Sequence, residues 1–164
     1  MATALDLRRR VDLGEEVSEN QALHQLNQSI LVAQLLTPPN GRPETFHGLR
    51  GYEWRLLEFC EIPFAYLLPS VQNWLGVIIE KTSIDEGFSL TGTMDGVLGC
   101  HTSLLTRIMI CHHAEKTLMD KGIQWILDYQ MLRKGEQCTW PGKDLYTRWG
   151  GCMKTNPCYY GVVK

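Results

Sequence analysis

Cysteine and histidine side chains give this chain its clearest capacity for metal chemistry. They occur at Cys100-His101, Cys111-His112-His113, Cys138, Cys152 and Cys158. Thiolate sulfur and imidazole nitrogen are ligands that zinc prefers. None of these segments has the Cys-x-x-Cys spacing that identifies a zinc site, so a site would combine distant residues, with His101, Cys138 and Cys152 as candidates. The alternative is packing, because a free cysteine usually behaves as a small buried hydrophobic residue. We therefore expect no bound cofactor.

Asp95 is the carboxylic acid whose position best suits proton transfer. It lies in the segment Thr91-Gly92-Thr93-Met94-Asp95-Gly96, just before an expected helix. A carboxylic acid enclosed by apolar side chains has a raised pKa and can donate a proton. An aspartate beside glycine is also typical of a turn or a helix cap. The sequence leaves both roles open.

Helical periodicity defines the elements that must position these residues. Apolar residues recur at spacings of three and four, which predicts helices over residues 20–36, 52–60, 70–80, 99–112 and 117–131, with a last helix beginning near Pro157. Ser18 or Asn20 is expected to cap the first of these helices, and a proline-rich segment over residues 37–43 ends it. Residues 1–17 are charged and have no clear period. No strand pattern competes, so the prediction is an all-α fold.

Two parts of the second half echo each other. Trp74-Leu75 followed by Gly87-Phe88 matches Trp125-Ile126 followed by Gly135 and Trp140. The segments that begin at Cys100 and Cys158 also match in the same order. Each unit is therefore expected to be a helix, an aromatic turn and a second helix. Such a pair exposes apolar flanks that neighbouring units cover.

The motif residues resemble a known family. The run from Lys121-Gly122 through Trp125, Gln130 and Gly135 to Trp140 resembles the glutamine–tryptophan repeat of squalene–hopene and oxidosqualene cyclases. The segments around Cys100 and Cys152 are similar to inner-helix starts of squalene-cyclase-like and prenyltransferase-like proteins. The resemblance covers about residues 70–164. It implies α/α helical-hairpin repeats that form part of a toroid, in which Gln130 bonds toward a helix end and Trp140 covers it.

The resemblance also implies an apolar ligand, such as an isoprenoid. Cyclases of this family use an acidic motif of the Asp-x-Asp-Asp kind, which is absent here, so Asp95 would be the proton donor to a central cavity. The side chains expected to line such a cavity are His101, Trp149, Tyr159 and Tyr160. Aromatic faces stabilise cations there, although they serve equally well as core residues. In the related prenyltransferases, Asp, Cys and His hold zinc, which again points to His101, Cys138 and Cys152.

The expected organisation is a helical N-terminal extension over residues 1–50 and a partial toroid over residues 51–164. The toroid part holds about two and a half helix pairs, whereas a closed ring needs roughly six. We therefore expect either a piece of a longer chain or an open arc, whose apolar edge needs a partner or a second copy.

Three functions follow. The first is a squalene-cyclase-like repeat protein that binds an isoprenoid or another apolar ligand without complete cyclase chemistry. The alternatives are a non-catalytic α/α-repeat protein-interaction module and a zinc-dependent prenyltransferase-like fragment. Whether the chain is an enzyme stays open.

The amino-acid composition limits the classes of binding partner that we expect. Hydrophobic residues make up 44% of the 164 residues, which is enough for a packed core, and the formal net charge is −2. The chain has no basic excess, so nucleic acid is not expected as a partner. No apolar run is long enough for a transmembrane segment, and we expect a cytoplasmic protein.

Overall fold

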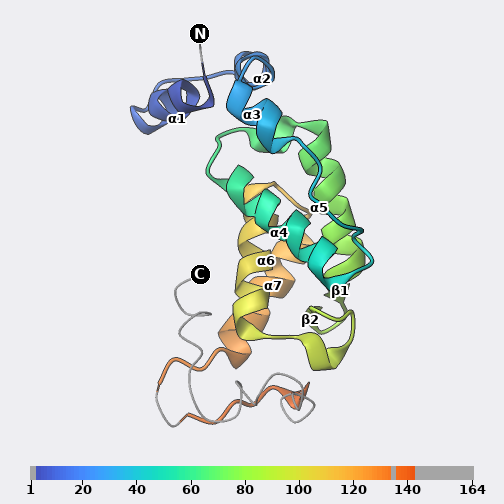
Figure 1. Ribbon diagram of the computed structural model, residues 1–164. Helices are drawn as coiled ribbons and strands as arrows, with labels where there is room; N and C mark the ends of the chain where they lie inside the picture. Colours follow the sequence, from blue (N-terminus) through green and yellow to red (C-terminus); the bar gives the residue numbers. More distant parts are fainter. Residues whose placement is uncertain (1–2, 134–135, 143–164) are drawn as a thin grey trace. The chain divides into compact units, whose positions relative to one another are not determined.

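The computed structural model describes residues 3–133 and 136–142, and this part of the chain is predominantly α-helical (Figure 1). Its α-helices are α1 (Ala4–Asp12), α2 (Glu19–Asn27), α3 (Ile30–Leu35), α4 (Phe46–Cys60), α5 (Pro69–Thr82), α6 (Gly99–Cys111) and α7 (Lys116–Tyr129). The remaining elements are the 3-10 turns η1 (Ala65–Leu67) and η2 (Met94–Gly96) and the strands β1 (Ser83–Ile84) and β2 (Gly87–Phe88). The helical fold class expected from the sequence is confirmed.

The chain divides into two compact units, Met1–Ile78 and Ile79–Lys164. The division falls inside α5, so the candidate residues Asp95, His101, Trp125 and Trp140 all belong to the second unit.

Helix α1 lies within the helical extension expected over residues 1–50, but no bounds were predicted for it, because residues 1–17 have no clear apolar period. A reciprocal capping box starts this helix. The Thr3 hydroxyl accepts from the Asp6 amide at 3.2 Å, and the Thr3 amide donates to the Asp6 carboxylate at 2.7 Å. These bonds satisfy backbone donors that the first helical turn leaves free. Leu7 is the large side chain that α1 buries. One large apolar residue is too few to produce a periodic signal in the sequence.

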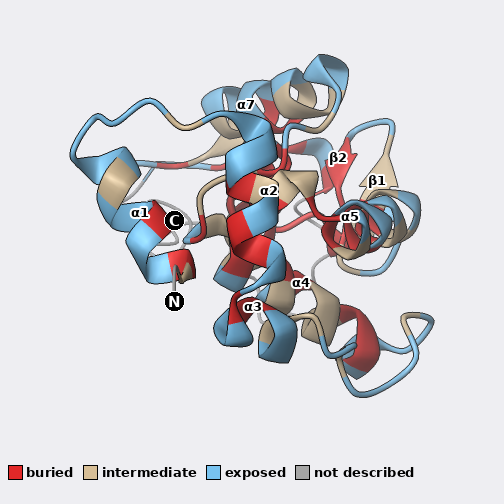
Figure 2. Ribbon diagram, turned by 90° about the horizontal axis from the view of Figure 1, so that it is seen from above, coloured by how far each residue is buried: buried red, intermediate tan, exposed pale blue. Residues whose placement is uncertain are grey.

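The single helix expected over residues 20–36 is wrong: the structure contains two helices, α2 and α3. Ser29 separates them with an extended backbone and caps α3, its hydroxyl accepting from the Val32 amide at 3.4 Å. The same hydroxyl accepts from the Ala4 amide at 3.3 Å. Ser18 caps α2 together with Gln21, and α2 buries one side while the opposite side is exposed (Figure 2). The apolar period continues across Ser29, but the hydrogen bonds of this serine to α3 and α1 favour a break between two helices.

Helix α4 begins earlier than expected, at Phe46, because Thr45 caps it through the Gly48 amide at 3.1 Å. A side chain at Gly48 would lie 1.9 Å from the Arg42 carbonyl oxygen, so the first turn of α4 packs on the preceding loop. Further along, Trp74 of α5 packs against Tyr52 and Phe59 of α4, with ring centroids 6.1 and 6.2 Å apart. These aromatic contacts form part of the core of the first unit.

In the second unit, α6 and α7 lie side by side as a helical hairpin (Figure 1). The chain reverses after α6 through His113, whose φ of 55° is left-handed. Gly122 lets the helices approach, since a Cβ there would lie only 2.1 Å from the Thr106 hydroxyl and 2.9 Å from the Phe88 ring. The apolar core of this unit therefore forms around a close crossing of α6 and α7.

A short β-hairpin lies in the segment expected only to turn. Strands β1 and β2 pair antiparallel, with Ser83 opposite Phe88 and Ile84 opposite Gly87. An isolated bridge between Ser89 and Val97 follows. Two-residue strands are too short to show the alternation by which strands are recognised in a sequence.

Candidate functional site

Asp95 lies in a turn rich in hydroxyl groups, immediately before α6. Its carboxylate accepts from the Thr91 hydroxyl at 3.3 Å and from the Thr93 hydroxyl. The side chain is half-buried. These contacts are those of an aspartate in a turn, which is one of the two roles that the sequence left open.

Ser89 organises this turn from within the core. Its buried hydroxyl accepts from the amides of Thr91 at 3.2 Å and Thr93 at 3.0 Å. The Leu90 amide donates to the Gly96 carbonyl at 2.8 Å and closes the loop. Gly96 has no room for a side chain, because a Cβ would lie 2.2 Å from the Thr91 hydroxyl. The turn is therefore fixed by its own backbone and hydroxyl groups.

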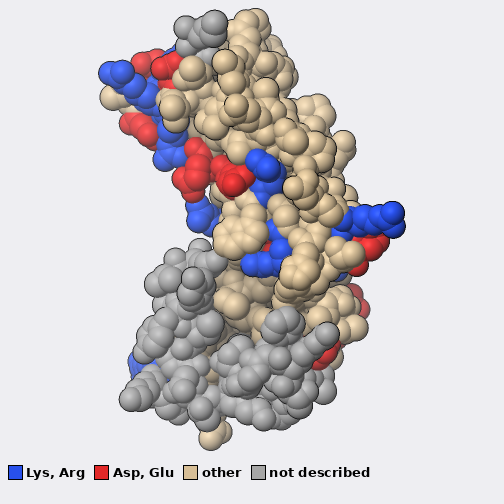
Figure 3. All heavy atoms as spheres, viewed as in Figure 1, with Lys and Arg blue, Asp and Glu red and all other residues tan. Residues whose placement is uncertain are grey.

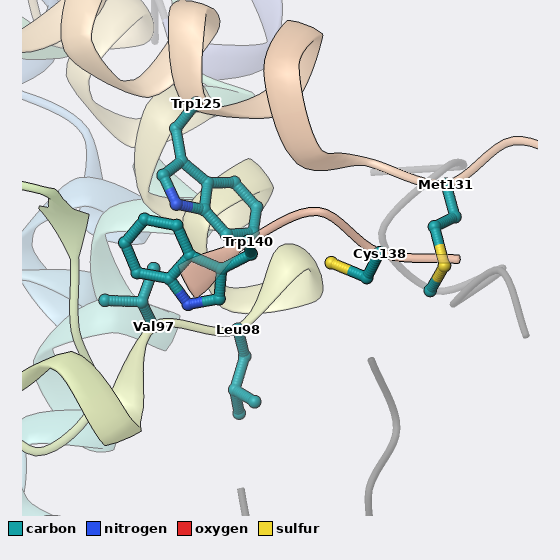
Figure 4. Close-up of a cluster of buried hydrophobic side chains, with 6 residues drawn as sticks. All are labelled: Val97, Leu98, Trp125, Met131, Cys138 and Trp140. Carbon is teal, nitrogen blue, oxygen red and sulfur yellow. The ribbon is translucent and has the colours of Figure 1, made fainter. Parts of the chain in front are cut away.

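The motif tryptophans come together in an aromatic cluster at the end of α7 (Figure 4). The ring centroids of Trp125 and Trp140 are 5.6 Å apart, and those of Tyr129 and Trp140 are 5.0 Å apart. Both tryptophans are buried. The apolar side chains buried with them are Val97, Leu98, Met131 and Cys138. Edge-to-face aromatic pairs of this kind add about 0.5–1.5 kcal/mol each beyond the burial of their area.

Gln130 lies at the C-terminal end of α7, beside this aromatic cluster. Its side-chain amide nitrogen donates to the Met131 carbonyl oxygen at 2.9 Å, just past the helix end. The Gln130 side-chain oxygen and the indole nitrogens of Trp125 and Trp140 are buried and have no hydrogen-bond partner among the described residues. The Trp125 and Trp140 rings pack edge to face, with an interplanar angle of 68° (Figure 4).

The chain after α7 is held by two further interactions. The Glu136 carboxylate accepts from the Leu132 amide at 3.0 Å and the Arg133 amide at 3.2 Å. These bonds, led by the one from Arg133, lower the pKa of Glu136. The Cys138 thiol donates to the Tyr129 carbonyl at 3.7 Å. Together they return the chain toward α7 and place Trp140 on Trp125.

Lys121 joins α7 to the β-hairpin. Its ammonium group donates to the Ile84 carbonyl oxygen at 2.8 Å and to the Ser83 hydroxyl at 3.2 Å. Trp125, one turn further on, lies so close to Gly87 that a Cβ there would be 3.2 Å from the indole ring. The lysine and tryptophan of the sequence motif therefore bind the same hairpin, a role that the sequence did not predict.

The two tryptophans that match in the sequence have different surroundings. Trp125 contacts Tyr129 in its own helix, α7, and Trp140 in the segment that follows α7. The ring contacts of Trp74 are with Tyr52 and Phe59 of α4, the preceding helix. The structural equivalence of the two sequence repeats therefore stays a prediction.

Of the candidate metal ligands, His101 and Cys138 are both buried in the second unit, His101 in the first turn of α6. Within residues 3–133 and 136–142, no three His, Cys, Asp or Glu side chains are arranged to hold a metal ion. Gly135, Trp149, Cys152, Tyr159 and Tyr160 lie outside the described residues. The zinc hypothesis therefore gains no ligand set from the described part of the chain.

Helix α4 carries a buried carboxylate that the sequence analysis did not single out. Glu53 is fully buried and forms an ion pair with Arg50 one turn earlier. The Arg50 guanidinium also lies 5.5 Å from the ring centroid of Trp54, which is half-exposed. Burying a carboxylate requires such a partner, and the three-residue spacing on a helix was the available signal.

The outer face of α7 is a second feature that the sequence analysis did not single out. Ile123 and Leu127 are one turn apart, and their side chains are 40% and 73% exposed. Leu132, just beyond the helix end, is also exposed. On the same helix, Lys116 pairs with Asp120, and Gln124 bonds to Asp128. The face therefore combines exposed apolar side chains with polar groups that are already paired.

On the face shown in Figure 3, the described residues carry charges of both signs and form no large single-sign patch. No helix in the described part of the chain is long and apolar enough to cross a membrane. Comparison of the chain with protein-family models, with characterised proteins and with solved structures finds no match. The similarity to squalene cyclases consequently rests on the motif residues alone.

Proposed function

We propose that this chain is a non-catalytic helical interaction module of squalene-cyclase-like character, and that it self-associates through the outer face of α7. The observation that carries the proposal is the exposure of Ile123 and Leu127 on a helix whose opposite face packs on α6. Helical-hairpin units commonly cover such flanks by stacking on a neighbouring unit.

A second copy of the chain is the partner that best fits this face. The polar groups beside Ile123 and Leu127 are engaged within α7: Lys116 forms an ion pair with Asp120, and the neutral Gln124 amide donates to the Asp128 carboxylate. Such a face carries little net charge, so it does not select a strongly charged partner, and repulsion between two identical faces is small at physiological salt. Contact between copies would be mainly apolar.

The association should be weak, because few side chains contribute. Complete burial of one leucine or isoleucine is worth about 1.5–3 kcal/mol. Ile123, Leu127 and Leu132 are only partly exposed, and burying their exposed parts in both copies gives a gross gain on the order of 8 kcal/mol, from which the loss of translational and rotational freedom is subtracted. We therefore expect a dissociation constant between about 0.1 and 1 mM, or roughly 4–5.5 kcal/mol.

Acid catalysis and apolar-ligand binding receive less support. Asp95 has hydroxyl contacts in place of an apolar enclosure, and the aromatic cluster of Trp125 and Trp140 is filled by its own side chains. Neither the Asp95 turn nor the aromatic cluster therefore offers an open apolar site. Isoprenoid binding remains the proposal that the sequence resemblance alone suggests.

Leu127→Glu tests the self-association. It places a charge in the centre of the proposed contact and should keep the protein monomeric in size-exclusion chromatography with light scattering at millimolar loading. Leu5→Glu is the matched control, because Leu5 is 70% exposed on α1 and should leave association unchanged. Equal dimer content in the wild type and Leu127→Glu would overturn the proposal.

A further inference from the structure

We draw no further inference here: the strongest candidate, the exposed rings of Phe46 and Trp54 on α4 with the partly buried Arg50 between them, carries none, because nothing in the structure shows what covers it.

Discussion

Replacing Gly122 with alanine tests the packing of α6 against α7 most sharply. The added Cβ would lie 2.1 Å from the Thr106 hydroxyl oxygen and 2.9 Å from a carbon of the Phe88 ring. Ordinary contacts of this kind are about 3.5–4 Å long, so one helix has to move by roughly 1 Å. Thr106 and Phe88 are buried and have little room to yield.

Two opposing effects set the size of the change. Alanine is favoured over glycine inside a helix by about 0.8–1 kcal/mol. Overpacking a core costs about 1–3 kcal/mol, and contacts this short belong at the upper end. We therefore expect Gly122→Ala to lower the free energy of unfolding by about 1–2 kcal/mol.

Urea denaturation followed by far-UV circular dichroism measures this difference. Gly76→Ala is the matched control, since Gly76 lies in α5 and a Cβ there meets nothing within 4 Å. Helix propensity alone should make that variant more stable by about 0.5–1 kcal/mol.

Thr106→Ala removes the hydroxyl that the new Cβ meets, at the cost of its bond to the Thr102 carbonyl at 2.7 Å. In that background, Gly122→Ala should be less harmful by about 1 kcal/mol, a coupling typical of residues in contact. If Gly122→Ala stabilises the protein as much as Gly76→Ala does, α6 and α7 do not pack closely at Gly122.

Three further predictions concern the second unit and the contact between α2 and η1. Trp140→Ala should lower the free energy of unfolding by about 3–5 kcal/mol, measured by urea denaturation, because the ring fills the core of the aromatic cluster; a loss below 1 kcal/mol would show that it is not core. Lys121→Met should cost about 1–2 kcal/mol through its lost bond to the hairpin and speed amide exchange there, whereas the exposed Lys116→Met should cost less than about 0.5 kcal/mol; equal losses would contradict this role. Burial, with help from the hydrogen bond to Glu19, raises the pKa of Tyr66 above its usual value near 10. The folded state therefore holds the phenol proton of Tyr66 more tightly than the unfolded state does. The resulting contribution to the free energy of unfolding is complete below pH 10 and is lost as pH rises through the raised pKa. Ultraviolet absorbance titration should show a late-titrating phenol that Tyr66→Phe removes, and a titration unchanged by Tyr66→Phe would count against this prediction.

The helices of the second half could be predicted because each has a long apolar period. The expected bounds for α6, residues 99–112, differ by one residue from the observed end at Cys111. The helices of the first half depend more on single polar side chains. Thr3 starts α1 and Ser29 divides α2 from α3, and both act through hydroxyl bonds that an apolar period does not contain.

In the candidate site, too, sequence spacing predicted some features, whereas individual side-chain contacts were not predicted. The spacing of Trp125 and Trp140 indicated a shared motif, and the two rings do meet in the core. The sequence offered a turn as one role for Asp95, but the partners that hold it there, the hydroxyl groups of Thr91 and Thr93 in the same loop, follow no sequence period. The contact of Lys121 with the hairpin joins residues distant in the chain, which no local pattern reports.

Methyl NMR over a dilution series tests the central claim most directly. With isoleucine and leucine methyl groups labelled, the signals of Ile123 and Leu127 should shift as the concentration rises from about 20 µM to 1 mM, across the range of dissociation constants expected above. The signal of Ile30, which is 68% exposed on α3, should stay in place. If the Ile123 and Leu127 signals are unchanged across that range, or if Ile30 shifts in their stead, the outer face of α7 is not the contact between copies.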